Sequence, residues 1–209
     1  IYTNYVNFSN NLKNILRFVL EVEQDKNVII TKEEQNLLIC FANKEYKLIK
    51  NNESIFNYGI KNKSWDVNIS DIPKNETVIT NLIESIRQRI IKNENITFTS
   101  EPSKLPSFFQ ILEEDAATHV HTDSNDLNNY HIRFNLIIQN AEEGGVPVYN
   151  GITKHCQERE YVLCRSGLDT HYCSKIKGNK PRFAISFGFN IPIHDAYKYP
   201  NIFYDLIQN

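Results

Sequence analysis

The stretch "RFAISFGF", residues 182–189, decides the fold. Successive side chains of a β-strand point to opposite faces, so this stretch predicts two different surfaces. One surface is small and polar, and it is formed by Arg182, Ala184, Ser186 and Gly188. The other surface is apolar, and it is formed by Phe183, Ile185, Phe187 and Phe189. We expect the apolar face to pack against helices and the polar face to form the wall of a pocket.

The sequence around this strand is rich in other short β-type segments. Between residues 106 and 192 they are "SFFQILEE", "ATHVHTD", "YHIRFNLIIQN", "GVPVYNG", "REYVLCR" and "PRFAISFGFNIP". Turn sequences such as "EEGG" and "KGNKP" separate them. This many short strands in one stretch predicts a β-sandwich or jelly roll.

The first hundred residues are expected to be mainly helical. Apolar residues recur at helical spacing in residues 9–23, 31–42 and 76–93. Thr31 and Glu34 have the spacing of a capping box, which predicts a helix start at this point. The segment between the last two helices is mixed and turn-rich. We therefore predict an α+β protein with one domain over residues 1–209, made of a helical part (1–100), a jelly-roll core (106–192) and a tail (193–209).

The composition limits the class of protein. Of 209 residues, 41% are hydrophobic and the formal net charge is -2, which gives no general case for binding nucleic acid or an anionic membrane. No apolar run of ~20 residues predicts a membrane span, and the start shows no pattern of a signal peptide. The four cysteines form no CxxC pair, so we expect reduced thiols and a cytoplasmic location.

The stretch "THVHTDS", residues 118–124, carries three side chains that can bind a metal. His119, His121 and Asp123 occupy alternate positions and share one face if the strand is regular. A histidine and a carboxylate two residues apart can hold one metal ion from one side. Two histidines and one carboxylate on a face of an octahedron leave three positions open, as in non-haem iron(II) oxygenases.

The third ligand has two candidates, His155 and His171. Arg165 follows His155 by ten residues, and Arg182 follows His171 by eleven. A guanidinium beside a hydroxyl, here Ser186, is suited to hold a carboxylate. The closing strand follows Arg182 and not Arg165, which favours His171.

Together, His121, Asp123, His171 and Arg182 resemble the motif of the 2-oxoglutarate/Fe(II)-dependent oxygenases, and the sequence is similar to prolyl-hydroxylase-like members. The resemblance covers roughly residues 106–192, under half of the chain. It implies a double-stranded β-helix, a distorted jelly roll, buttressed by the N-terminal helices.

The resemblance also implies a chemistry. Fe(II) would be held by His121, Asp123 and His171, and 2-oxoglutarate would occupy two of the open positions. The far carboxylate of 2-oxoglutarate would pair with Arg182, with Ser186 as a hydroxyl partner. The enzyme would use O₂ to hydroxylate an unactivated C–H bond, and the resemblance favours a protein or peptide side chain as substrate.

Several other residues have open roles. Arg133 and Asn135 share a face of residues 130–140 with His131 and are candidates for holding cosubstrate or substrate; the alternative is a surface ion pair. His119 is expected to be structural or to support a ligand. Tyr149 and Tyr161 could hydrogen-bond the cosubstrate, although aromatic residues in strands usually pack.

Two competing functions remain open at this point. One is a cupin-type metal-binding protein or metalloenzyme that uses His119 and His121 as a pair and needs no 2-oxoglutarate. The other is a non-catalytic interaction module on the same scaffold. The cupin pattern also needs a downstream Glu and a second motif ending in His and Asn, which this sequence does not clearly contain.

Overall fold

The computed structural model describes residues 28–207, except 52–57, 62, 74 and 98–99. The helix expected at residues 9–23 lies outside the described residues. Among the described residues, no helix has the length and apolar character needed to cross a bilayer.

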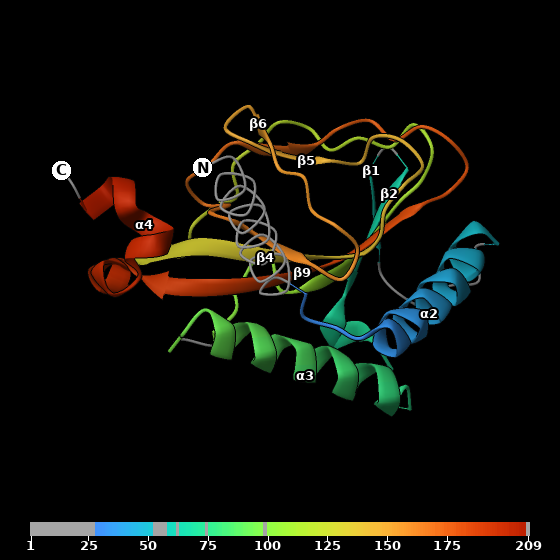
Figure 1. Cartoon of the computed structure of the whole chain (residues 1–209), viewed down its shortest axis with the longest axis horizontal. Helices are drawn as coiled ribbons and strands as arrows, with labels where there is room; N and C mark the ends of the chain where they lie inside the picture. Colours follow the sequence, from blue (N-terminus) through green and yellow to red (C-terminus); the bar gives the residue numbers. More distant parts are fainter. Residues whose placement is uncertain (1–27, 52–57, 62, 74, 98–99, 208–209) are drawn as a thin grey trace, which may run out of the picture.

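Two antiparallel sheets form the centre of the molecule (Figure 1). The larger sheet contains, in spatial order, β1 (Tyr58–Lys61), β2 (Ser64–Asn68), β3 (Phe108–Leu112), β9 (Arg182–Pro192), β4 (Asn129–Gln139) and β7 (Tyr161–Cys164). The smaller sheet contains β6 (Ile152–Thr153), β5 (Pro147–Tyr149) and β8 (His171–Cys173). A cavity lined by residues of both sheets lies between them.

The two faces predicted for residues 182–189 are confirmed. Strand β9 lies in the middle of the larger sheet and pairs with both β3 and β4. All four residues of its apolar face are completely buried, and they are Phe183, Ile185, Phe187 and Phe189. Three residues of the opposite face line the cavity, and they are Arg182, Ala184 and Ser186.

Gly188 is the exception on the polar face, because the segment before β3 covers it. A Cβ atom at this position would lie 3.0 Å from Cδ of Pro102 and 3.3 Å from the carbonyl oxygen of Leu105. The missing side chain therefore lets this segment lie directly on the sheet.

Two helices, α2 (Lys32–Lys50) and α3 (Thr77–Asn93), cover the apolar face of the larger sheet (Figure 1). The capping box is confirmed, since Thr31 Oγ1 accepts a hydrogen bond from the Glu34 amide and Glu34 accepts one from the Thr31 amide. Leu38 of α2 and Ile86 of α3 are fully buried in the same core as the β9 phenylalanines.

The larger sheet extends further than the sequence predicts. Strands β1 and β2 lie in the segment expected to be mixed and turn-rich, and β2 pairs with β3. In β2 the apolar Trp65 and Val67 belong to the core and alternate with the polar Ser64, Asp66 and Asn68, of which Ser64 is also buried. With only two apolar positions, this strand gives a weak period-2 signal.

Residues 117–123 differ from the expected strand. Within this segment only His121 forms a β-bridge, with His171.

The tail forms a 3₁₀ turn, η2 (Ile193–Lys198), and a short helix, α4 (Pro200–Ile207). Phe203 of α4 is buried beside Tyr130, with ring centroids 5.3 Å apart, so the tail packs on the sheet.

Candidate metal centre

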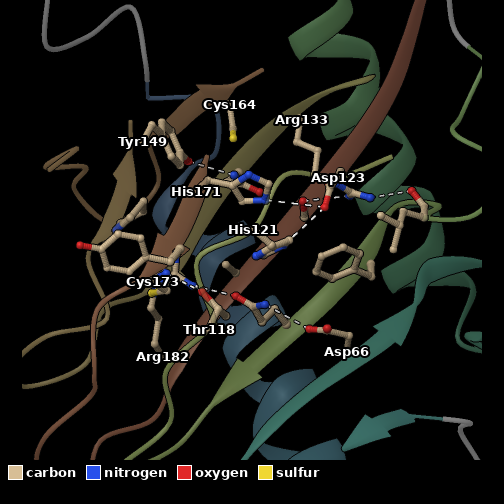
Figure 2. Close-up of a pocket in the computed structure, with 18 residues that line it drawn as sticks. Asp66, Thr118, His121, Asp123, Arg133, Tyr149, Cys164, His171, Cys173 and Arg182 are labelled. Atoms are coloured by element: carbon tan, nitrogen blue, oxygen red, sulfur yellow. Dashed lines mark hydrogen bonds and ion pairs between the residues drawn. The ribbon is translucent and has the colours of Figure 1, made fainter. Parts of the chain in front are cut away.

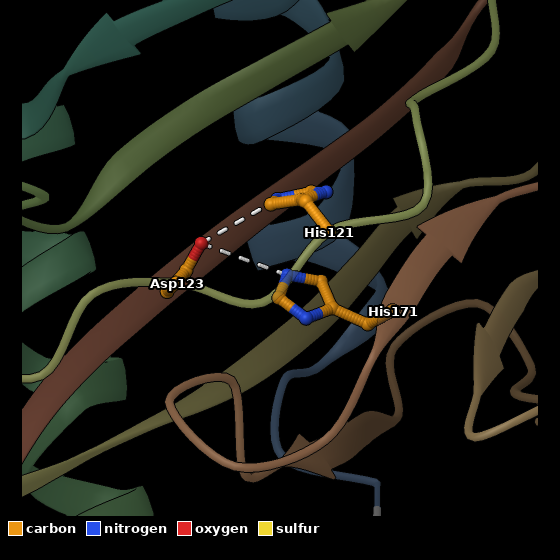
Figure 3. A group of neighbouring side chains, drawn as sticks. All are labelled: His121, Asp123 and His171. Carbon is orange, nitrogen blue, oxygen red and sulfur yellow. Dashed lines mark ion pairs between the residues drawn. The ribbon is translucent and has the colours of Figure 1, made fainter.

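Three side chains that line the cavity converge on one another (Figure 3), and they are His121, Asp123 and His171. Nε2 of His121 lies 3.4 Å from Oδ1 of Asp123, and Nε2 of His171 lies 3.7 Å from the same oxygen. The donor atoms of the three residues all lie within 4.8 Å of one another. Two imidazole nitrogens and one carboxylate oxygen at these separations can bind a single divalent ion.

Backbone hydrogen bonds hold the two histidines together, although they are fifty residues apart in the sequence. The His121 amide donates to the His171 carbonyl at 3.1 Å, and the His171 amide donates back at 2.7 Å. The Asp123 amide donates to the Ser166 carbonyl at 2.7 Å. The main chain therefore places all three side chains before any metal binds.

The hydrogen bonds at Nδ1 set the tautomer of both histidines. Nδ1 of His121 lies 2.7 Å from the carbonyl oxygen of His119, and Nδ1 of His171 lies 3.1 Å from that of Asp169. A carbonyl oxygen can only accept, so Nδ1 carries the hydrogen in each ring and the Nε2 lone pair faces Asp123. The side chain of His119 is exposed and lies outside the three-residue group.

Asp123 is held as a carboxylate. Burial raises its pKa, but the contact with His121 and the charge of the Arg133 guanidinium outweigh burial and hold the pKa well below its usual range. Nε of Arg133 donates to Oδ2 at 3.2 Å. Because Oδ2 is engaged by this guanidinium, Oδ1 is the oxygen that faces both histidines.

Arg133 is occupied by protein acceptors at each nitrogen. Besides the bond to Asp123, Nη1 donates to Ser186 Oγ at 3.1 Å and Nη2 donates to the Leu105 carbonyl at 2.6 Å. The guanidinium also lies over the Phe108 ring, 4.7 Å from its centroid. The structure thus places Arg133 and Ser186 in the cavity wall, bound to one another, with Arg133 supporting Asp123.

His131 is a neighbour of the centre that the sequence placed only on the face of Arg133. It is completely buried, and Nδ1 lies 3.6 Å from Asp123 Oδ2. Burial and the charge of Arg133 lower its pKa to about 4, so the ring is neutral near pH 7. In the sequence, only its position two residues before Arg133 in β4 indicated that His131 lies on the same face as Arg133.

The cavity has a volume of about 190 Å³ and contains a second charged side chain, Arg182 (Figure 2). Arg182 is 3% exposed, and its Nη1 donates to Gln110 Oε1 at 3.2 Å. Its Nε has no hydrogen-bond partner. Among the described residues, no carboxylate lies within ion-pair distance of Arg182. A buried guanidinium without a counter-ion favours an anionic ligand.

The remaining predicted residues fall into two groups. Asn135 lines the cavity, and its Nδ2 donates to the hydroxyl of Tyr149, which also lines the cavity, at 3.0 Å. Tyr161 instead donates to Glu94 at the end of α3. His155 is exposed and is not among the residues that line the cavity.

Sequence comparisons give no assignment, since neither the known family models nor the curated protein sequences contain a match. Two solved structures are similar in fold. AviO1 from Streptomyces viridochromogenes Tue57 superposes with a TM-score of 0.58 and 10% identity, over 79% of this chain and 88% of that one. The viral collagen prolyl hydroxylase of Paramecium bursaria Chlorella virus-1, in a 2-oxoglutarate complex, gives 0.53 and 12%, over 79% and 93%.

The chain shares the fold of these two proteins. The resemblance inferred from the sequence is thereby confirmed at the level of fold. At these identities the similarity assigns no substrate, and the chemistry must be argued from the side chains of this chain.

Proposed function

We propose that this chain is an Fe(II)- and 2-oxoglutarate-dependent dioxygenase that hydroxylates an unactivated C–H bond. One observation carries the proposal: a two-histidine, one-carboxylate group and a buried arginine without a counter-ion line the same cavity. The first is suited to Fe(II), and the second is suited to an anionic cosubstrate. On this assignment the two sheets form a double-stranded β-helix, and residues 1–209 form a single catalytic domain.

The donor set fits the metal. His121, Asp123 and His171 would hold Fe(II). Both imidazoles are neutral and carry their hydrogen on Nδ1, so each Nε2 can bind the metal, and the carboxylate is ionised. Burial lowers the pKa of His171, which keeps its lone pair available near neutral pH. Three protein ligands leave open positions for 2-oxoglutarate and O₂, and the bound metal with its cosubstrate supplies the oxidising chemistry.

The residues of the chain position the cosubstrate. We assign the far carboxylate of 2-oxoglutarate to Arg182, whose guanidinium lies in the cavity wall. Gln110 fixes one edge of that guanidinium through its carbonyl oxygen. Tyr149 and Asn135 form part of the wall beside it. Ser186 acts mainly through Arg133, because its oxygen accepts from that residue.

The test is an anaerobic titration of the purified protein with Fe(II) and 2-oxoglutarate. We expect a visible metal-to-ligand charge-transfer band that is absent from the His171→Ala variant. His155→Ala is the matched control and should retain the band, because His155 lies outside the cavity. Absence of the band, together with no succinate in air with any candidate substrate, would contradict the proposal.

The same titration tests the cupin-type alternative. That alternative needs His119 as a ligand, and it expects His119→Ala to lose metal while His171→Ala retains it. The geometry favours the reverse, because His171 and not His119 belongs to the three-residue group, and the backbone carbonyl of His119 accepts from His121.

A further inference from the structure

A second carboxylate, Asp66, lines the cavity and is not used by the proposed centre. Asp66 lies on β2, on the face opposite the buried Trp65 and Val67. It pairs with Gln110 of β3, which pairs in turn with Ala184 of β9. Asp66 is therefore two strands from β9. Figure 2 shows Asp66 and Arg182 on the same side of His121, apart from Asp123.

The charged groups of the cavity do not all pair with one another. Arg133 and Asp123 form an ion pair at 3.2 Å. Arg182 and Asp66 are linked only through the amide of Gln110, whose Oε1 accepts from Arg182 at 3.2 Å and whose Nε2 donates to Asp66 Oδ1 at 3.1 Å. Among the described residues, no cation lies within ion-pair distance of Asp66.

This arrangement leaves one cationic and one anionic group for bound molecules. Asp66 is half-buried, and burial raises its pKa although the hydrogen bond from Gln110 and the charge of Arg133 act in the opposite direction. Gln110 engages Oδ1, so Oδ2 is the oxygen left to a ligand. Since 2-oxoglutarate is an anion, it is suited to Arg182 and is repelled by Asp66. The group that meets Asp66 must come from the second molecule in the cavity.

We propose that Asp66 is a specificity-determining residue that selects a substrate carrying a protonated amine or guanidinium group. The proposal rests on the proposed function and names the chemical class of its substrate. Two carboxylates line the cavity in the described part of the chain; Asp123 forms an ion pair with Arg133, and a charge-assisted hydrogen bond to a substrate cation would give Asp66 an ion-pair partner as well.

The experiment compares matched probes that differ in charge. Succinate formation by the Fe(II)-loaded protein is measured with Nα-acetyl-L-arginine amide and Nα-acetyl-L-citrulline amide, whose α-amines carry no charge, and with N-acetylated hexapeptide pools that contain one fixed arginine or one fixed citrulline and no other basic residue. We expect the arginine probes to raise succinate above the probe-free rate at least about tenfold more than the citrulline probes. Asp66→Asn should abolish this difference. Asp115→Asn, which removes an exposed carboxylate with lysine partners, should retain it.

Two measurements keep this result separate from the proposed function. The charge-transfer band must appear in both wild type and Asp66→Asn, and the variant should unfold at a temperature no lower than the wild type, because burial already disfavours the charged form. With the band present, the proposal is overturned if citrulline probes act equally, if the preference survives in Asp66→Asn, or if no arginine probe raises succinate. Loss of the band in the wild type would instead count against the proposed function.

Discussion

Arg133 reaches the candidate metal ligand Asp123 from strand β4 and engages only one of its oxygens. The other oxygen faces His121 and His171. This division presents Asp123 as a one-atom ligand, which preserves the open positions that the proposed reaction needs. The sequence placed Arg133 on the correct face of its strand, but it could not show that Asp123 and Leu105 would already occupy the guanidinium.

The first prediction concerns this contact. Arg133→Gln should weaken Fe(II) binding about tenfold or more, because groups that orient a metal ligand typically contribute 10–100-fold to affinity. Isothermal titration under anaerobic conditions measures the affinity. Arg89→Gln is the control, since Arg89 forms an ion pair with Glu34 between α2 and α3, in a different part of the protein. Equal affinities in wild type and Arg133→Gln would show that the contact does not position Asp123.

At the scale of the element, strand β9 separates the core from the site. Its odd-numbered phenylalanines and Ile185 pack in the core with the helices, and Arg182, Ala184 and Ser186 line the cavity. The sequence could predict this because eight consecutive residues alternate without interruption. It did not predict β1, β6 or β8, which are only two to four residues long and lie outside the longer β-type segments that marked the equally short β5 and β7.

The second prediction tests the two faces of β9. Phe187→Ala should lower the free energy of unfolding by about 3–5 kcal/mol, because it leaves a cavity in a completely buried core. The neighbouring Ser186→Ala should cost much less in stability, yet it removes a hydrogen bond from Arg133 and should weaken metal binding. Urea denaturation and metal titration distinguish the two effects. Comparable stability losses in both variants would contradict the assignment of faces.

The backbone bridge between His121 and His171 shows a limit of sequence reasoning. The expected strand at residues 117–123 would have placed three side chains on one face, His119 included. In the structure only the bridge forms, and His119 turns its carbonyl oxygen toward His121 while its side chain is exposed. In a regular strand, side chains alternate between the two faces. An isolated bridge fixes only one residue, so the side chains beside it can point elsewhere.

At the scale of the whole molecule, the proposed centre joins segments that are distant in the sequence. His121 and Asp123 precede β4, and His171 begins β8 of the smaller sheet. A metal held by these residues therefore links two sheets that otherwise meet around a cavity. On this proposal the folded protein offers the ion a preformed group of ligands, which the unfolded chain lacks.

The third prediction follows from this linkage. A ligand that binds only the folded state stabilises it by RT ln(1 + [L]/Kd), or about 2.7 kcal/mol at one hundred times Kd. Adding Mn(II), a redox-stable substitute, should raise the thermal unfolding temperature of the wild type, and a chelator should reverse the change. His171→Ala should show no increase at the same concentration. An equal increase in that variant would place the ion elsewhere.

The most direct test of the central claim is a crystal structure with Fe(II) and 2-oxoglutarate, with the metal located by anomalous scattering. We predict one iron bound by Nε2 of His121, Oδ1 of Asp123 and Nε2 of His171, with the far carboxylate of 2-oxoglutarate on Arg182. Iron bound by the side chain of His119 or His155, or 2-oxoglutarate bound away from Arg182, would contradict the account.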